Sequence, residues 1–459
     1  MRRLSIAVLC LLIATNAGAA LAQPPSAKDD GYRGIWFTLG QKCEYGDKYS
    51  GGLGTYTAKH VPLAVYSAAA KKTFFVYGGA KEGQRHLLAM VSYYDHERGV
   101  VPRPTIVHDK QGVNDPHDNP SIAIDEQGHI WVFVSGRGRV RPGFRYRSVK
   151  PYDIDAFELV ATDEFTYPQP WWIEGEGFLL LFTKYTNGRE LYFSRSVDGR
   201  TWSPAEKLAG MGGHYQVSNQ RSGRVITAFN WHPKGNVDQR TNLYFAQTDD
   251  LGHTWQTVDG KPLELPLADT HCPALVRDFQ AEGRMVYVKD IQFDEQGNPV
   301  VLVVTSASYE PGPKGDPRIW TIVLWKDDRW QFHEVTRSDH NYDMGSLYIE
   351  SDGQWRIIAP TETGPQRWGA GGEMVAWISR DQGASWQKAR DITHGSPLNH
   401  AYARRPVNAA PDFYAFWADG NPDEFSPSRL YFCNREGDRV WRLPYDMSGE
   451  TARPEPVGP

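Results

Sequence analysis

The amino-acid sequence predicts an all-β protein that folds as a seven-bladed β-propeller, in a single domain over residues 23–459. Three observations lead to this fold class: a strand pattern that recurs along the chain, a turn motif that recurs within it, and the lack of amphipathic segments of helix length. The 16 Trp, 23 Tyr and 19 Phe residues also suit strands, because aromatic side chains pack well on a pleated sheet.

The repeat unit reads strand, glycine-containing turn, strand, long loop, strand, turn and strand. Its second strand is the easiest to recognise. The seven second strands lie at residues 72–79, 129–136, 178–185, 224–231, 298–306, 354–361 and 412–420. Because each unit holds four strands, each is expected to form one blade. The spacing is widest between the fourth and fifth units, where residues 262–284 are expected to form an insertion packed on one face.

A recurring turn follows the third strand of three units. Residues 248–255 (TDDLGHTW) and 379–386 (SRDQGASW) match one Asp-box pattern fully, and residues 196–202 (SVDGRTW) fall one residue short of it. In such turns the Asp binds backbone amides, the Gly permits a left-handed conformation and the Trp packs between sheets. These residues are therefore expected to be structural and not catalytic.

The N-terminus predicts export. Arg2 and Arg3 precede a short apolar run and an Ala-Leu-Ala sequence, which together indicate a Sec signal peptide over residues 1–22, cleaved after Ala22. The mature protein is expected in the periplasm or outside the cell, as a monomer with no membrane span. It keeps an odd number of cysteines (Cys43, Cys272 and Cys433), so disulfides are not expected to hold the fold together. A net charge of -5 gives no sign of nucleic-acid binding.

Polar side chains concentrate at one end of the predicted blades. The loop that enters the first strand and the loop that leaves the second strand open on the same face of a propeller, so residues there converge on one mouth. First-strand entries hold His60, His117, Tyr167, His214, Tyr215, Lys289, Asp290, His340, Asp343, His400 and Tyr402. Second-strand exits hold Tyr77, Arg137, Lys184, Tyr185, His232, Glu362 and Asp419. This mouth is the expected place for a ligand site.

Several motifs resemble a known family. They are KYSGGLGTYTAKH, YDHERGVVPRPT, HDNPSI, GHYQVS, TAFNWHPKG, NYDMGSLYIE and YARRPVN, and together they run from about residue 31 to the C-terminus. The chain resembles the BNR-repeat proteins that include the seven-bladed ulvan lyases. The resemblance implies a lyase that cleaves a sulfated, uronic-acid-containing polysaccharide by β-elimination.

The chemistry of β-elimination agrees with the residues at the mouth. The C5 proton of a uronate is a very weak acid while its carboxylate is charged, so cations or strong donors must neutralise that carboxylate. A base then removes the proton, and an acid can protonate the departing O4. The resemblance implies proton transfer by His117, Tyr167 and Tyr215. Arg137 and Lys184 stand where relatives have a histidine and an arginine, and we expect them to meet the carboxylate; otherwise they are solvated strand ends.

Five further residues are predicted to contact substrate. Asn119 follows His117 in the PHDNP motif, Tyr185 follows Lys184, and His214 precedes Tyr215. Arg404 and Arg405 in YARRPVN could bind sulfate or carboxylate, with an inter-blade salt bridge as the alternative.

A metal is a separate expectation. His232, Cys272, His340 and His400 belong to the same predicted face and are residue types that zinc takes, although their spacing fits no compact motif. The resemblance implies a zinc ion of structural type near the insertion that carries His271 and Cys272. The alternative is a buried thiol among unrelated histidines. No organic cofactor is expected.

Two other functions fit a propeller of this kind. A sialidase-like glycoside hydrolase commonly carries Asp-boxes, but it needs three arginines around a carboxylate and an early Arg-Ile-Pro signature, and Arg33 in GYRGIW does not match that signature. A non-catalytic carbohydrate-binding propeller would be expected to repeat a similar pocket in each blade. The blades here differ at the mouth, and histidine and tyrosine are densest in the second to fourth, which favours one specialised site.

Overall fold

The computed structural model describes residues 26–53, 59–81, 83–84 and 86–458. The predicted signal peptide lies outside the described residues. Strands dominate, and the helices of the described part are three single-turn 3-10 helices, η1 (Pro116–Asp118), η2 (Pro233–Gly235) and η3 (Pro313–Gly315). No helix within these ranges is long and apolar enough to cross a bilayer.

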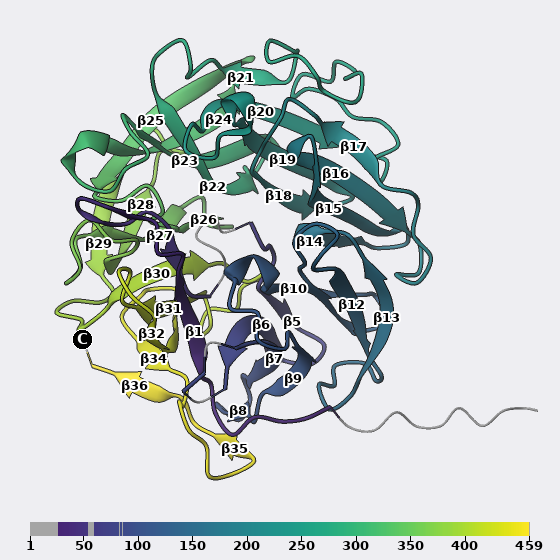
Figure 1. Ribbon diagram of the computed structural model, residues 1–459, viewed down its shortest axis with the longest axis vertical. Coiled ribbons are helices and arrows are strands. Elements are labelled where there is room, and N and C mark those ends of the chain that lie inside the picture. Colours follow the sequence, from purple (N-terminus) through teal and green to yellow (C-terminus); the bar gives the residue numbers. More distant parts are fainter. Residues whose placement is uncertain (1–25, 54–58, 82, 85, 459) are drawn as a thin grey trace, which may run out of the picture.

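Six sheets are each built from one stretch of chain and follow one another in sequence order around a common centre (Figure 1). Their strands are β10 (Pro120–Ile124), β11 (Ile130–Val134), β12 (Gly143–Ser148) and β13 (Phe157–Asp163); β14 (Thr166–Ile173), β15 (Gly177–Thr186), β16 (Gly188–Ser196) and β17 (Glu206–Ala209); β18 (Gln216–Arg221), β19 (Arg224–Trp231), β20 (Thr241–Thr248) and β21 (Leu275–Arg277); β22 (Met285–Phe293), β23 (Pro299–Ser306), β24 (Arg318–Lys326) and β25 (Arg329–Ser338); β26 (Ser346–Ile349), β27 (Trp355–Glu362), β28 (Glu373–Ser379) and β29 (Gln387–Asp391); and β30 (Asn399–Arg404), β31 (Ala415–Gly420), β33 (Leu430–Cys433), β34 (Val440–Arg442) and β36 (Glu455–Val457).

One further sheet is composite, because it joins strands from both ends of the chain. Its order is β32 (Ser426–Ser428), β1 (Gly34–Thr38), β6 (Lys72–Ala80), β7 (Leu87–Asp95) and β9 (Thr105–Asp109), with β4 (Ser50–Gly51) paired to β1 and β5 (Ala64–Ser67) paired to β6. Two ribbons complete the strands: β2 (Lys42–Cys43) with β3 (Gly46–Asp47), and β8 (Val101–Pro102) with β35 (Thr451–Ala452).

The all-β propeller is thus confirmed, with six regular blades and a composite sheet in place of seven similar copies. The predicted second strands are β6, β11, β15, β19, β23, β27 and β31, each of which lies inside its sheet between two neighbours. Every residue of β11 and β23 is buried. Buried central strands read as nearly continuous apolar runs, which is why these segments were the clearest in the sequence.

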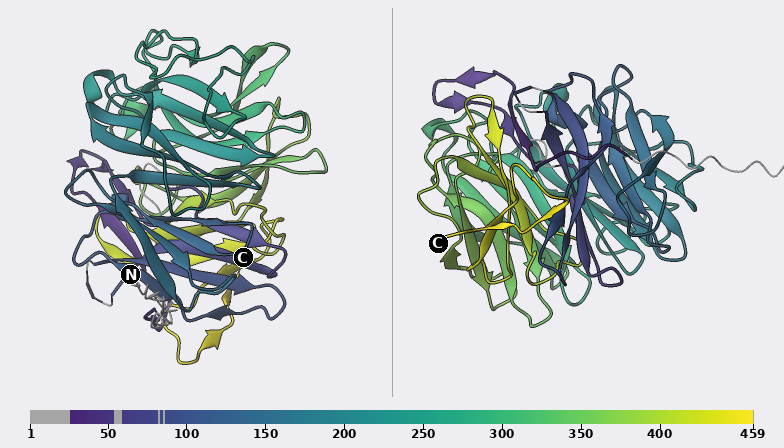
Figure 2. Two further views of the ribbon diagram at one scale, coloured as in Figure 1. Left: turned by 90° about the vertical axis from the view of Figure 1, so that its right-hand side faces the viewer. Right: turned by 90° about the horizontal axis from the view of Figure 1, so that it is seen from below.

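The composite sheet closes the ring. Strand β1 pairs with β32 through Ile35 and Pro427, and it reaches β6 through Gly34 and Gly79. The purple strand β1 therefore runs among the yellow C-terminal strands, as Figures 1 and 2 show. This pairing ties the two ends of the chain together and leaves fewer exposed sheet edges.

Replacing Gly420 with alanine should weaken this closure. Gly420 ends β31, and a Cβ there would lie 2.1 Å from the ring of Trp36 in β1, which is fully buried. Overpacking of this kind costs about 1–3 kcal/mol. The melting temperature of Gly420→Ala is therefore expected to fall below that of the wild type. In Gly449→Ala the nearest atom would be 3.4 Å away, so that variant should melt with the wild type; equal melting of both variants would contradict the closure.

The Asp-box turns have the structural role predicted for them. Asp250 accepts a hydrogen bond from the Thr254 amide at 2.9 Å, and Asp381 accepts one from the Ser385 amide at 2.9 Å. Gly252, in the same turn as Asp250, has a φ of +81°. Strand β21 lies inside the stretch predicted as an insertion, so those residues supply the outer strand of their sheet. Cys43, Cys272 and Cys433 are free, as expected.

Candidate active site at the mouth of the propeller

Irregular backbone marks three of the predicted first-strand entries. The pairing of β14 with β15 shifts register at Tyr167, which has a φ of +54°. The pairing of β30 with β31 shifts at Tyr402, with a φ of +65°, and that of β22 with β23 shifts at Lys289. A bulge redirects a side chain, and a positive φ is costly for a bulky residue, so both features are commonly found at functional sites. All three side chains are at most 1% exposed.

His117 lies in η1, where a carboxylate holds its ring. Asp115 caps η1 by accepting a hydrogen bond from the His117 amide at 3.1 Å, and it also binds Nδ1 of the same residue. Because a carboxylate only accepts, Nδ1 is the donor and the neutral imidazole carries its lone pair on Nε2. Burial lowers the pKa of His117 below its ordinary value, and the bond to Asp115 offsets this only in part.

Two arginines bind the other oxygen of the same carboxylate. Arg137 donates to Oδ2 of Asp115 at 2.6 Å, and Arg141 donates to it at 2.7 Å. Burial raises the pKa of Asp115, but its bonds to His117 and the two arginines outweigh burial and hold that pKa well below the ordinary value. Asp115 is therefore ionised under all ordinary conditions and orients the His117 ring.

The three predicted proton-transfer residues form one chain of ring contacts across three blades. The ring of Tyr167 lies 5.5 Å from that of His117 and 5.6 Å from that of Tyr215. The ring of His60 also lies 5.5 Å from that of Tyr167, and the ring of His232 lies 4.6 Å from that of Tyr215. The predicted convergence of these side chains is confirmed. His117, Tyr167 and Tyr215 are each at most 1% exposed, so a sugar can reach them only after neighbouring groups move.

The more exposed part of the cluster carries the two predicted cations. The side chain of Arg137 is 34% exposed, and that of Lys184 is 23% exposed. Both already meet carboxylates, since Arg137 binds Asp115 and the Lys184 ammonium lies 3.8 Å from Glu164. Tyr185, beside Lys184, has a guanidinium 5.5 Å from its ring centre.

That guanidinium belongs to Arg189, one of three arginines that the sequence reasoning missed. The other two are Arg141, described above, and Arg240. Arg240 is 2% exposed, and its guanidinium carbon lies 4.6 Å from the ring centre of Tyr215. All three stand at or just before the start of a third strand, where the chain returns from the mouth.

Two predicted substrate-binding residues have structural partners instead. Asn119 donates to the carbonyl of Leu53 at 3.2 Å and is fully buried. His214 uses both ring nitrogens, because Nε2 accepts from the Met211 amide at 3.2 Å and Nδ1 donates to the Asn230 carbonyl at 2.8 Å. These two side chains are therefore engaged in holding loops at the mouth.

Arg404 and Arg405 lie at the end of β30. Arg404 is 4% exposed, and burial lowers its pKa to about 10. Nε of Arg405 lies 3.9 Å from Oδ2 of Asp290 in β22. This ion pair joins two blades, and such a salt bridge was the alternative to ligand binding.

The predicted metal ligands do not form a zinc site. Among the residues that the structure describes, no group of three His, Cys, Asp or Glu side chains is arranged to hold a metal ion. His400 bonds to Trp417 at 2.9 Å through Nδ1 and to Ser396 at 2.9 Å through Nε2. His340 accepts from the Tyr342 amide, and His232 packs on Tyr215. His340 and His400 thus have partners in their own blade, whereas neither ring nitrogen of His232 has a hydrogen-bond partner among the described residues.

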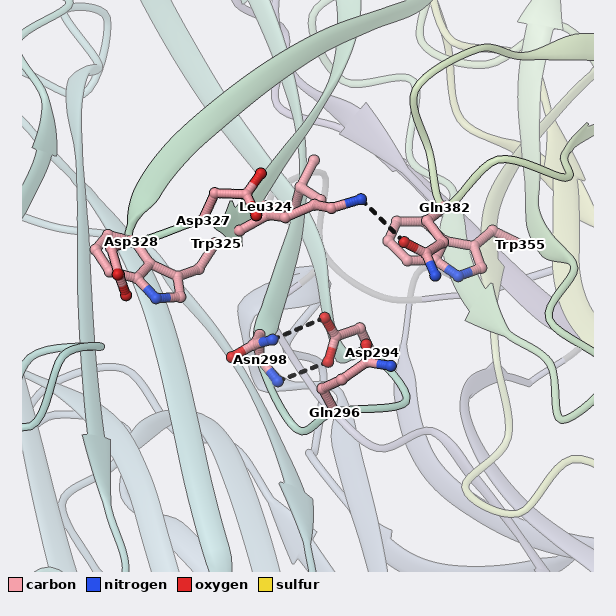
Figure 3. Close-up of a pocket in the computed structure, with 10 residues that line it drawn as sticks. Asp294, Gln296, Asn298, Leu324, Trp325, Asp327, Asp328, Trp355 and Gln382 are labelled. Atoms are coloured by element: carbon pink, nitrogen blue, oxygen red, sulfur yellow. Dashed lines mark hydrogen bonds between the residues drawn. The ribbon is translucent and has the colours of Figure 1, made fainter.

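A pocket of about 350 Å³ lies away from this cluster (Figure 3). Its wall includes the turn between β22 and β23, where Asp294 accepts hydrogen bonds from the amide and the side chain of Asn298 at 2.7 and 3.1 Å. Trp355 and Gln382 lie on the other wall. These turns are at the opposite ends of the strands from the mouth, and no predicted site residue lines this pocket.

Fold and site together define an all-β propeller with one asymmetric cluster of histidine, tyrosine and arginine at a shared mouth. Residues 88–338 match the model of the family described as BNR repeat-containing family member. Because this match covers more than half of the chain, the protein belongs to the BNR repeat-containing family.

Relatives and solved structures agree with this membership. The chain is 22% identical over 397 residues to an ulvan lyase of Pseudoalteromonas sp. (strain PLSV), covering 73% of this chain and 76% of the relative. It is 20% identical over 362 residues to an ulvan lyase of Alteromonas sp. (strain LOR), covering 70% and 73%. A solved PL25 ulvan lyase superposes with a TM-score of 0.70 at 17% identity, covering 89% of this chain and 96% of the other.

Proposed function

We propose that this protein is a polysaccharide lyase that cleaves a sulfated, uronic-acid-containing polysaccharide of the ulvan class by β-elimination. Ulvan lyases of two bacteria are similar to it over about 70% of the chain. A PL25 ulvan lyase with the same fold has been solved with -[GlcA(1-4)Rha3S]- bound. The observation that carries the proposal is the contact chain of His117, Tyr167 and Tyr215, with a carboxylate orienting the histidine.

The reaction assigns a role to each of these groups. A base removes the C5 proton, the electron pair forms the C4–C5 double bond, and the C4–O4 bond breaks as O4 takes a proton. His117 suits the base, because Asp115 fixes its Nδ1 as a donor and Nε2 then accepts the proton. The buried phenols of Tyr167 and Tyr215, beside it, are suited to protonate the departing oxygen.

Two further expectations extend this proposal. The composite sheet would serve as the seventh blade, since it fills the gap between the first and last regular sheets. Residues 1–22 would be removed on export, so that the mature protein acts in the periplasm or outside the cell, where a long polysaccharide is accessible. A zinc ion has no part in the proposal, because the predicted ligands do not fit one.

Absorbance of the product tests the function directly. The mature protein is incubated with ulvan, with heparinoids and with alginate, and the near-ultraviolet absorbance of the unsaturated uronate is followed. We expect absorbance to rise with ulvan, and we expect His117→Ala to lose the activity. His271→Ala is the matched control, because the His271 side chain is 70% exposed. New reducing ends without absorbance would indicate a hydrolase, and binding without cleavage would indicate a carbohydrate-binding propeller.

A further inference from the structure

Arg240 is a buried cation whose charge no carboxylate of the described chain neutralises. It immediately precedes β20 and is 2% exposed. Its Nε donates to the carbonyl of Val237 at 2.8 Å, and its Nη2 has no hydrogen-bond partner among the described residues. No Asp or Glu within those residues forms an ion pair with it. Asp238, two positions away, is instead bound by Lys48 at 2.8 Å and by the hydroxyl of Tyr49.

Tyrosine rings surround the guanidinium in place of a carboxylate. Its central carbon lies 4.6 Å from the ring centre of Tyr215, 4.9 Å from that of Tyr342 and 5.2 Å from that of Tyr287. The faces of aromatic rings attract cations, so these contacts favour the charged form. They do not supply the hydrogen-bond acceptors that the guanidinium would have in water, and a buried charge without an opposite charge is costly.

Other buried arginines of the chain show what is missing. Besides Arg404, four other arginines have at most 8% exposure, and each of these four has a carboxylate oxygen within 3.1 Å: Arg33, Arg145, Arg318 and Arg356. The environment of Arg240 therefore differs from theirs in the one group that normally accompanies such a side chain. An anionic ligand would supply that group.

We propose that Arg240 binds the carboxylate of the uronate whose C5 proton is removed, so that it is the neutralising cation of the reaction. This inference rests on the proposed function. Of the cations predicted for this role, Arg137 is bound to Asp115 and Lys184 lies beside Glu164. The guanidinium of Arg240 can bind both oxygens of a carboxylate in one plane, as arginine commonly does.

The position of Arg240 is consistent with this role. It stacks on Tyr215, which contacts Tyr167, which contacts His117. In a uronate the carboxyl carbon is bonded to C5, so the group that neutralises the carboxylate must lie close to the groups that move the C5 proton. When that proton leaves, negative charge spreads onto the carboxylate, and a fixed cation there stabilises the transition state more than the ground state.

Arg240→Met separates this role from a structural one. Because the charge has no carboxylate partner, its removal should leave the melting temperature unchanged or raise it. The same change should lower kcat/KM on ulvan about 100-fold or more, since one stabilising group of this type is worth that much. Activity equal to the wild type in a folded Arg240→Met protein would overturn the proposal, and so would a lower melting temperature with retained activity.

Arg356→Met is the matched control. Arg356 is 6% exposed and pairs with Glu350 at 2.8 Å. It lies in β27, in the half of that strand that is near the turn and away from the mouth. We expect the opposite pattern from this variant: a lower melting temperature, because a buried carboxylate loses a partner, and unchanged kcat/KM per folded molecule.

A binding assay keeps the inference separate from the lyase proposal. Calorimetry with D-glucuronate and with D-glucose should show binding of the uronate alone by the wild type, and Arg240→Met should lose it. Arg240→Lys, which keeps the charge, should bind glucuronate about 10-fold more weakly because it lacks the paired donors. This variant decides the outcome if the methionine variant does not fold, and wild-type affinity in it would overturn the inference.

The two proposals then fail in different ways. Ulvan cleavage by both wild type and Arg240→Met would contradict the role of Arg240 and leave the lyase intact. Glucuronate binding that depends on Arg240, in a protein that cleaves none of the polysaccharides, would contradict the lyase and leave the carboxylate site intact.

Discussion

Asp115→Asn is expected to lower kcat on the polysaccharide about 100-fold or more while the protein stays folded, because general acid and base catalysis contributes rate factors of that size. Asp115 binds Nδ1 of His117, caps η1 and accepts from Arg137 and Arg141. An asparagine can keep the shape of this contact, but its neutral amide no longer stabilises the imidazolium that forms when His117 takes a proton. Steady-state kinetics on purified variant protein measure the loss.

The same variant should move the pH profile. Burial lowers the pKa of His117, and the carboxylate of Asp115 opposes that effect. Without the carboxylate the pKa should fall further, so the acid limb of kcat/KM should shift to lower pH. Asp118→Asn is the control, because Asp118 binds Lys110 at 2.7 Å and Arg141 at 2.9 Å but does not touch the ring of His117. Equal losses of kcat in both variants, with no shift in the acid limb of either pH profile, would mean that Asp115 only supports the loop.

Much of the fold could be predicted from the sequence because the second strands are buried on both faces. A fully buried strand such as β23 must be apolar along its whole length, and that demand leaves a clear pattern. The closure through β1 and β32 left no such pattern. Strand β32 has three residues, two of them serine, and its pairing with Ile35 depends on ring geometry and not on local preference. The sequence therefore predicted similar units and missed the composite sheet.

The site was partly predictable for a geometric reason. First-strand entries and second-strand exits do meet, which brought His117, Tyr167 and Tyr215 into contact. The starts of the third strands form a further set of positions on the same face, because a chain that leaves a second strand at the mouth also returns there. Arginines stand at or within two residues of five such starts: Arg141, Arg189, Arg240, Arg318 and Arg429. One of these arginines, Arg240, is the cation that lies on Tyr215.

The described residues offer no support for the metal prediction, because they hold no group of three possible ligands. Sequence position can place His340 and His400 on one face, but it cannot tell which way each ring turns or what it meets there. The hydrogen bonds of His400 to Trp417 and Ser396 engage both of its nitrogens. Residue type and face are therefore necessary for a metal site, and local hydrogen bonding decides whether the ligands are available.

Mild acid is expected to destabilise the protein strongly, because the folded protein buries neutral histidines. Burial lowers the pKa of His60 to about 3 and that of His214 to about 4, from an ordinary value of 6.5. Between these values and 6.5 the unfolded chain binds more protons than the folded one. Stability is therefore full above pH 6.5 and falls as the pH drops toward the folded pKa values.

The size of the effect follows from the same difference. Each unit of pH below the unfolded pKa costs about 1.4 kcal/mol per histidine, so at pH 4.5 these two side chains together cost about 5 kcal/mol. Domains are commonly stable by about 5–15 kcal/mol in total, so the loss is large. Melting temperatures at pH 7.5, 6.0 and 4.5 measure it. In His214→Gln the melting temperature should fall less with pH, because the contribution of one histidine is removed. In the wild type, protonation of His214 breaks the hydrogen bond that its ring accepts from the Met211 amide. His271→Gln, at an exposed side chain, should follow the wild type, and a melting temperature that stayed constant down to pH 4.5 would mean that the buried rings admit protons without cost.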